Sequence, residues 1–178
     1  MSEGEPIFTP EDFIRYIARY RGVDKEYFRI PNQLILLYRK SAFEYTRQVL
    51  NGKVLDWLYG KSRPFYVGVV DGKEIGVFRM WIGAPAAAAM LEELIACGAK
   101  SVFEVGLAGG LQPSLTPGDI VVVTEAIRDE GTSNHYFQPE VGLEASPRLR
   151  SLLIHRLNIK EIKHHVGPVW TTDGAYRC

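Results

Sequence analysis

Cysteine is almost absent from this sequence: its 178 residues include only Cys97 and Cys178. A scaffold of several disulfides, on which small secreted proteins depend, is therefore excluded. The sequence also lacks an uninterrupted apolar run of ~18 residues, the length that a membrane-spanning helix needs. Its acidic, polar first residues do not have the composition of a signal peptide. Together these absences predict a cytoplasmic protein.

An excess of either charge is lacking too, because 21 Lys and Arg residues balance 21 Asp and Glu residues. A nucleic-acid-binding surface usually needs a basic excess, so we expect no nucleic-acid partner, and no membrane partner either. The hydrophobic share of 46% is ordinary for a globular protein. We expect residues 1–178 to form a single domain, since a chain of this length can bury a core of its own.

The apolar residues recur in patterns that predict alternating strands and helices. Strands are expected near Leu34, Val67, Val77, Val102, Val121 and Val166, at residues 33–38, 65–70, 74–80, 101–105, 120–124 and 162–171. Helices are expected at residues 10–21, 41–50, 86–97 and 147–157. This order predicts an α/β fold, a three-layer sandwich in which helices flank a central mixed β-sheet.

The first of these helices carries signals at both ends. Thr9 is a suitable N-cap, Pro10 fits the first helical position, and Gly22 would end the helix. Its apolar side chains recur at helical spacing and are expected to face the core. They are Phe13, Ile14, Ile17 and Tyr20.

The most informative stretch is residues 101–136, where a glycine-rich turn follows an apolar strand. Gly106, Gly109 and Gly110 come directly after that strand, and a Pro-Gly-Asp turn precedes the next one. Glycine lets backbone N–H groups approach a ligand and permits a positive φ. Ligands of open α/β sheets bind beyond the carboxyl ends of the strands. The sequence therefore predicts a ligand crevice at this turn.

Four blocks, in order and at matching spacing, resemble those of the purine and uridine phosphorylase family, the hexamer-forming class of nucleoside phosphorylases and nucleosidases. The blocks are Ile82-Gly83-Ala84-Pro85 followed by the helix Leu91-Glu92-Glu93-Leu94, Val105-Gly106-Leu107-Ala108-Gly109, Gly118-Asp119-Ile120, and Arg128-Asp129-Glu130-Gly131 with Ser133 and His135. A fifth, weaker block is Thr171-Thr172-Asp173 with Tyr176. Each block alone is common in proteins. Their order and spacing carry the resemblance, which extends over residues 83–176.

The resemblance implies an enzyme of nucleoside metabolism, a pentosyltransferase that cleaves the N-glycosidic bond of purine or pyrimidine nucleosides. Inorganic phosphate would be the co-substrate, with no other cofactor and no metal. It implies a nucleoside site formed by Gly106, Leu107, Ala108 and Gly109, with Ala175 and Tyr176 near the base. It also implies a homo-oligomer, because the family completes its site with residues of a neighbouring subunit. The apolar segment at residues 54–59 is a candidate contact surface.

The phosphate ligands of the family are largely replaced in this sequence. Glu104 stands where the family has an arginine, and Leu107 where it has a serine or threonine. The first phosphate loop lacks its glycine and leaves Arg39 as a candidate phosphate ligand. A carboxylate would repel phosphate, whereas in a nucleosidase that uses water Glu104 could orient that water, which makes it the candidate catalytic residue. Alternatively, Glu104 forms an ion pair with Arg128 or another base.

Two further catalytic features of the family have no counterpart in this chain. The Met-Glu pair that grips the ribose and the Asp that protonates the leaving base would both follow the last block. We therefore expect the chain to lack its C-terminal third, as a fragment or a truncated product. Its function is left open between an enzyme, phosphorylase or nucleosidase, and a catalytically inactive relative that serves as a ligand-binding or assembly module.

The histidines leave several interpretations open. His135 is a base, a ligand or a hydrogen-bond donor that orders its loop. His164 and His165 are not expected to bind a metal together, because adjacent strand residues point to opposite faces. Ala175 takes a place that a base-stacking Phe often holds in the family, so stacking there would depend on Tyr176.

Overall fold

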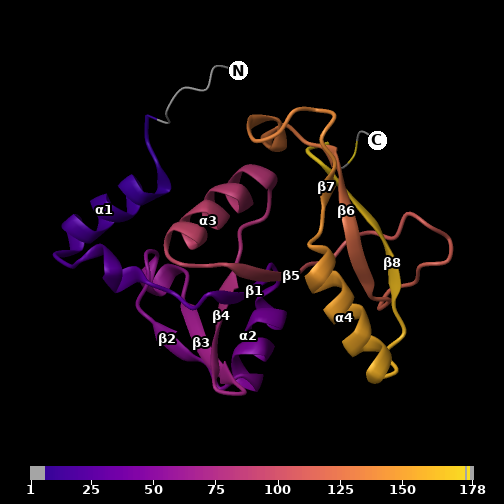
Figure 1. Ribbon diagram of the computed structural model, residues 1–178, viewed down its shortest axis with the longest axis horizontal. Coiled ribbons are helices and arrows are strands. Elements are labelled where there is room, and N and C mark those ends of the chain that lie inside the picture. Colours follow the sequence, from indigo (N-terminus) through magenta and orange to yellow (C-terminus); the bar gives the residue numbers. More distant parts are fainter. Residues whose placement is uncertain (1–6, 175, 177–178) are drawn as a thin grey trace. The chain divides into compact units, whose positions relative to one another are not determined.

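The chain forms two compact units, Met1–Gly106 and Leu107–Cys178, in a computed structural model that describes residues 7–174 and 176 (Figure 1). Each unit has a sheet with helices beside it, so the predicted α/β class with mixed sheets is confirmed. The strands are divided between two sheets, where we expected one central sheet. That both units fold together as one domain stays a prediction.

The first unit is built on a five-stranded sheet in the order β2-β3-β4-β1-β5. β1 pairs in parallel with β4 and β5, whereas β3 pairs antiparallel with β2 and β4. The strands are β1 (Gln33–Leu37), β2 (Lys53–Leu55), β3 (Phe65–Val70), β4 (Lys73–Arg79) and β5 (Ser101–Val105). The predicted hairpin turn between β3 and β4 has positive φ at both central residues, 50° at Asp71 and 75° at Gly72.

Three layers are present within this unit, because β1 sends alternate side chains to two separate clusters. Leu34 and Leu36 join the larger cluster with residues of α1 (Pro10–Arg21) and α3 (Ala84–Ala96). Leu37 instead packs with Phe43 of α2 (Lys40–Val49). Figure 1 shows α3 and α2 on opposite sides of the sheet. The predicted three-layer arrangement is therefore confirmed in this unit.

The α1 helix begins and ends as predicted, and Phe13, Ile14 and Ile17 of its predicted face contact the core. The Thr9 side chain caps it, and Gly22 takes the left-handed conformation with φ 67°. Ile14 is buried, but the expectation for Tyr20 was wrong, since it is 83% exposed and Ala18 is buried instead. Arg21 anchors the helix end by donating to Asp56 Oδ1 and to the carbonyl oxygens of residues 57 and 58.

The second unit contains a three-stranded sheet in the order β7-β6-β8. Its elements are β6 (Val121–Asp129), the 3-10 turn η3 (Thr132–His135), β7 (Leu143–Glu144), α4 (Pro147–Ile159) and β8 (His165–Thr172). β6 and β8 are parallel, and α4 packs against β6. β6 runs on to Asp129, beyond the predicted end, and β8 begins later than predicted, at His165.

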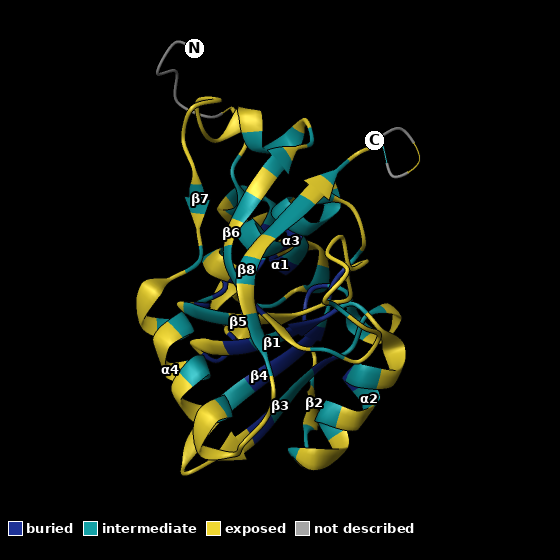
Figure 2. Cartoon of the chain, turned by 90° about the vertical axis from the view of Figure 1, so that its right-hand side faces the viewer, coloured by how far each residue is buried: buried dark blue, intermediate teal, exposed yellow. Residues whose placement is uncertain are grey.

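Burial is sparse in the second unit. Among its described residues only Val122 belongs to the buried apolar set, and Figure 2 shows β6, β8 and α4 mostly in the colours of intermediate and exposed residues. Ile127, Leu152 and Val166 are 51%, 48% and 50% exposed. Soluble monomers seldom expose many large apolar side chains in one place. This unit therefore presents apolar side chains on its surface.

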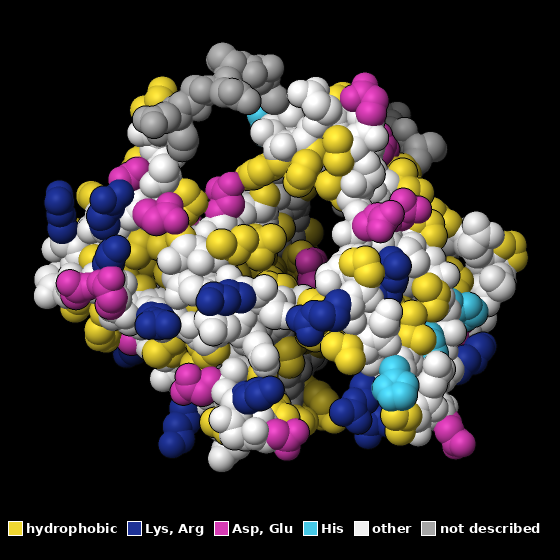
Figure 3. Space-filling view, in the orientation of Figure 1, with side chains coloured by type: hydrophobic (Ala, Val, Ile, Leu, Met, Phe, Trp, Pro, Cys, Tyr) yellow, Lys and Arg dark blue, Asp and Glu magenta, His cyan; other side chains and the backbone are white. Residues whose placement is uncertain are grey.

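The surface charge agrees with the balanced composition. Basic and acidic side chains are interspersed on the face drawn in Figure 3, which has no extended patch of one sign. In the described part of the chain, no helix has both the length and the apolar character needed to cross a bilayer.

Candidate functional site

A phenol and a carboxylate meet at the carboxyl ends of two neighbouring parallel strands. β1 and β5 pair in register, with Leu36 opposite Glu104. The hydroxyl of Tyr38, directly after β1, donates to Glu104 Oε1 at 2.5 Å. Burial, together with this hydrogen bond, raises the pKa of Tyr38 well above its usual value. The phenol therefore stays neutral and holds one carboxylate oxygen of Glu104 in place.

Glu104 has a neutral hydrogen-bond partner within the first unit. Within the described residues of the first unit, no Lys, Arg or His lies within ion-pair distance of its carboxylate. The N–H groups of Arg128 are hydrogen-bonded to other acceptors inside the second unit. The described residues of the first unit thus offer Glu104 no ion-pair partner, whereas an ion pair with Arg128, which belongs to the second unit, stays a prediction. Glu104 lies exposed beside the glycine turn, and a carboxylate at this position disfavours an anionic ligand.

The glycine turn is open, and its glycines have ordinary backbone conformations. Positive φ, which glycine permits, does not occur at Gly106, Gly109 or Gly110; it occurs at Gly118, with φ 100°. A Cβ on Gly106 would lie 3.6 Å from the Tyr38 ring, and one on Gly109 would meet nothing within 4 Å. A Cβ on Gly110 would lie 3.1 Å from Leu115 Cβ, so the backbone is unobstructed at Gly106 and Gly109 but close to Leu115 at Gly110.

The predicted nucleoside residues divide between the two units. Gly106 ends the first unit, and Leu107, Ala108 and Gly109 begin the second, all of them exposed. Tyr176 is 97% exposed, and Ala175 lies outside the described residues. The predicted nucleoside residues therefore belong to two different units. Their role in nucleoside binding stays a prediction.

Arg39 is accessible at the start of α2. It is the N-cap residue of that helix, makes no side-chain capping hydrogen bond, and is exposed. A helix N-terminus with a guanidinium beside it is compatible with an anion. Phosphate binding by Arg39 stays a prediction.

The Asp119 carboxylate joins the turn before β6 to the beginning of β8. It accepts hydrogen bonds from the backbone N–H and hydroxyl of Thr116, and these bonds hold the pKa of Asp119 below its usual range. Lys163 Nζ and His165 Nε2 lie 3.8 Å and 3.5 Å from its oxygens. The resemblance had singled out Asp119 without a role, and the structure gives it a structural one.

The other histidines serve local structure or lie in the open. His164 Nδ1 lies 2.9 Å from the carbonyl oxygen of Ile162, whereas His165 contacts Asp119. His135 is an exposed residue at the end of η3. No three His, Cys, Asp or Glu side chains of the described residues are placed to hold a metal ion.

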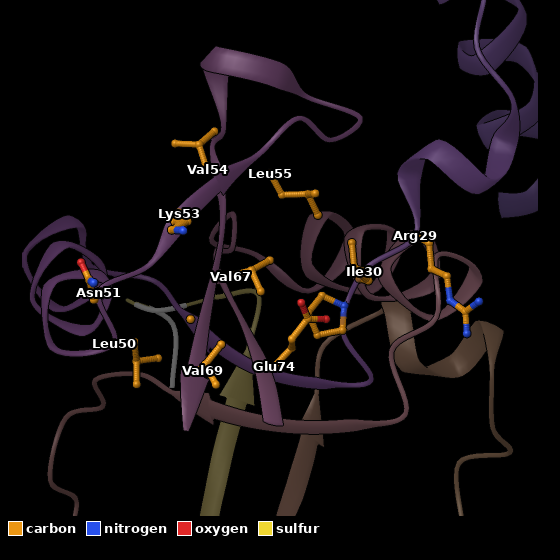
Figure 4. A pocket seen from close by; sticks show the side chains of 12 residues that line it. Arg29, Ile30, Leu50, Asn51, Lys53, Val54, Leu55, Val67, Val69 and Glu74 are labelled. Carbon is orange, nitrogen blue, oxygen red and sulfur yellow. The ribbon is translucent and has the colours of Figure 1, made fainter. Parts of the chain in front are cut away.

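A groove of about 750 Å³ lies elsewhere in the first unit and was not predicted. Apolar side chains of β2 and β3, including Val67 and Val69, line it together with Arg29, Lys53 and Glu74 (Figure 4). Glu74 is at the beginning of β4, so the groove is near the opposite strand ends from Tyr38 and Glu104. Its lining comes from four separate segments, which no local sequence pattern could bring together.

Comparison with known proteins identifies the family. The model of the phosphorylase superfamily matches residues 40–178. Uridine phosphorylase of Treponema pallidum is 34% identical over 119 residues, which cover 66% of this chain and 46% of that protein. The corresponding enzyme of Thermococcus kodakarensis is 33% identical over 111 residues, covering 62% of this chain and 40% of the relative. This chain therefore spans about half the length, or less, of these relatives.

Solved structures agree in fold. Uridine phosphorylase of Vibrio fischeri, complexed with 6-hydroxy-1-naphthoic acid, has a TM-score of 0.76 and 30% identity, covering 86% of this chain and 62% of that one. Purine nucleoside phosphorylase of Toxoplasma gondii, complexed with immucillin-H, has a TM-score of 0.77 at 23% identity, covering 85% and 61%. The likeness to the second structure concerns the fold alone. With the family model matching most of its length, this chain belongs to the phosphorylase superfamily.

Proposed function

We propose that this chain supplies a nucleoside-binding crevice of the uridine phosphorylase type, in which the N-glycosidic bond is held without a phosphate beneath it. The observation that carries the proposal is the Tyr38–Glu104 pair beside the glycine turn. An anion placed next to this carboxylate would be repelled, and the Tyr38 hydroxyl donates its hydrogen bond to Glu104 and not to a ligand. Water is a neutral molecule and can approach the same carboxylate.

The supporting chemistry concerns Glu104 as an acceptor. Tyr38 occupies Oε1, and the exposed carboxylate retains further lone pairs that can accept from water. A water held in this way is a nucleophile for hydrolysis of the glycosidic bond, with Glu104 as the general base. Hydrolysis is thus the reaction that this arrangement favours over phosphorolysis, and phosphate is not required as a co-substrate.

A non-catalytic, ligand-binding role is the second candidate. Leu107 favours it, because an exposed apolar side chain stands where the family has a hydroxyl that touches phosphate and ribose. Under this alternative the open turn binds nucleosides, and no base is released. The two candidates differ only in turnover, so both require nucleoside binding at residues 107–109 and Tyr176.

Nucleoside binding is tested by titrating the ¹⁵N-labelled chain with uridine, inosine and adenosine. We expect shifts of the amide signals of Gly106, Leu107, Ala108, Gly109 and Tyr176. Glu104→Gln keeps the size of the side chain and one acceptor, and serves as the matched variant: it should bind nucleosides but hydrolyse none. Shifts confined to other parts of the chain, for example to the groove lined by Arg29 and Glu74, would refute the proposed site.

We further propose a cytoplasmic homo-oligomer. The segment at residues 54–59 cannot be the main contact surface, because Trp57 and Leu58 are buried in the core of the first unit. The exposed apolar side chains of β6, β8 and α4 are the better candidates, since burial of such surface drives association. Light scattering tests this proposal, and a stable monomer at high concentration would contradict it.

A further inference from the structure

Arg128 is a cation whose hydrogen-bonding capacity is completely used by neutral groups. A guanidinium has five N–H donors, and each one finds an acceptor. Nε donates to Ser133 Oγ at 2.8 Å, and one terminal nitrogen donates to the carbonyl oxygens of Gln138 and Val141 at 2.6 Å and 3.1 Å. The other donates to Asn134 Oδ1 at 2.9 Å and to the carbonyl oxygen of Phe137 at 3.2 Å.

These five bonds hold a segment that has no apolar core of its own. We call residues 130–142 the Arg128 loop; it leaves β6 after Asp129 and returns into β7. None of its residues is buried, and Phe137 and Val141 are 46% and 43% exposed. Its conformation therefore depends on polar contacts centred on Arg128, to which Glu130 adds hydrogen bonds from the backbone N–H of Ser133.

The beginning of the Arg128 loop is also joined to the end of β8. Gly131 N–H donates to Asp173 Oδ2 at 3.0 Å, and Asp173 N–H donates to the carbonyl oxygen of Asp129 at 3.2 Å. Gly174 N–H then donates to Thr172 Oγ1, which turns the chain after the strand. The residues leaving β8 towards Tyr176 thus start from a cross-link to the Arg128 loop.

The geometry points to Arg128 and Asp173 as positioning residues that fix the chain where it leaves β8, shortly before Tyr176, without touching the nucleoside. This inference rests on the proposed function for the role of Tyr176. Arg128 sets the path of the loop, the loop sets the direction of the Gly131 N–H, and this N–H orients the Asp173 side chain. A lysine could not replace Arg128, because an ammonium is a point charge with three donors and cannot reach five acceptors arranged around a planar fork.

The test compares Arg128→Lys with Arg150→Lys by amide hydrogen exchange and nucleoside titration. Arg150 is a matched control in the same unit, because among the described residues its guanidinium makes one hydrogen bond, to the carbonyl oxygen of Thr124. In Arg128→Lys we expect at least tenfold faster hydrogen exchange at four hydrogen-bonded backbone amides. Two are in the loop, at Phe137 and Val141, and two are in the cross-link to β8, at Gly131 and Asp173. Uridine binding should weaken at least tenfold, while Arg150→Lys matches the wild type.

Substitutions at Asp173 test the hydrogen bond that joins the Arg128 loop to the end of β8. Asp173→Asn keeps an oxygen acceptor for Gly131 N–H and should behave like the wild type, whereas Asp173→Ala should speed exchange at Gly131 and weaken uridine binding. These two Asp173 variants also test the inference if Arg128→Lys does not fold. Faster exchange confined to residues 134–141, with Gly131, Asp173 and uridine affinity unchanged, would overturn the inference. If the wild-type chain binds no nucleoside, the proposed function fails, and exchange at Gly131 and Asp173 alone decides the positioning role.

Discussion

Replacing Tyr38 by Phe removes the hydroxyl that Glu104 accepts and leaves the ring in place. A hydrogen bond to a charged group contributes about 1.5–3 kcal/mol when both partners are shielded. Glu104 is exposed, so water replaces part of the lost contact, and we expect a loss of about 1 kcal/mol in the free energy of unfolding. For a chain of this size that corresponds to a fall of about 2–4 °C in Tm.

The pH dependence of this loss identifies its cause. Because the folded-state pKa of Tyr38 is raised, the hydroxyl contributes its full stabilisation below the ordinary tyrosine pKa of about 10. The contribution declines as the pH rises above that value towards the raised pKa. The stability difference between wild type and Tyr38→Phe should therefore be complete at pH 7 and smaller at about pH 11.

Urea denaturation followed by tryptophan fluorescence measures the loss in the free energy of unfolding and its dependence on pH. Glu104→Gln and the double variant complete a double-mutant cycle. We expect the two single substitutions to be strongly non-additive, because they remove the same hydrogen bond. Equal stability of wild type and Tyr38→Phe at pH 7 would refute the reasoning, as would a difference that persists undiminished at high pH.

Three further predictions concern the fold. Leu94→Ala, at a fully buried position, should lower the free energy of unfolding, measured by urea denaturation, by about 2–5 kcal/mol. Leu152→Ala on the exposed face of α4 should cost well under half as much. Similar losses for the two variants would contradict the burial pattern. Gly118→Ala should lower the free energy of unfolding by more than about 1 kcal/mol because Gly118 has a positive φ. Gly106→Ala should be nearly neutral in the same measurement. The reverse order would show that the glycine turn at residues 106–110 is strained. Asp119→Asn should lower the free energy of unfolding at neutral pH. The difference from wild type should vanish as the pH falls below about 4 through the lowered pKa of Asp119. A difference that does not change with pH would assign the effect of the substitution to packing.

Local patterns predicted much of the first unit. The bounds of β3 and β5 are those expected from their apolar runs, and Thr9, Gly22 and the Asp71-Gly72 turn act as their side chains and backbone preferences predict. β2 and β7 were missed, because runs of three and two residues leave no recognisable period.

The candidate site was less predictable, because it depends on which strands become neighbours. Nothing local to Tyr38 or Glu104 indicates that β1 lies beside β5, yet this pairing creates their hydrogen bond. The block containing Arg128 was found through the resemblance, but its five acceptors lie in a loop whose path only the structure gives. In the same way, glycine content predicted an open turn at residues 106–110 but not the φ values of its glycines.

Substitution of Glu104 separates the two interpretations of the crevice. Glu104→Arg restores the charge that phosphate requires, so phosphate dependence of base release should appear or increase if the carboxylate faces the anion position. Glu104→Leu removes the charge without supplying a ligand and is the matched control. If both variants leave the response to phosphate unchanged, Glu104 has only a structural role.

The most direct test of the central claim is base release from uridine, inosine and adenosine by the purified 178-residue chain, measured with and without inorganic phosphate. Because Glu104 and Leu107 replace two phosphate partners, and the loss of a single electrostatic donor can cost ~10²–10³ in rate, we predict no phosphate-dependent base release. Turnover that rises with phosphate concentration would contradict the account.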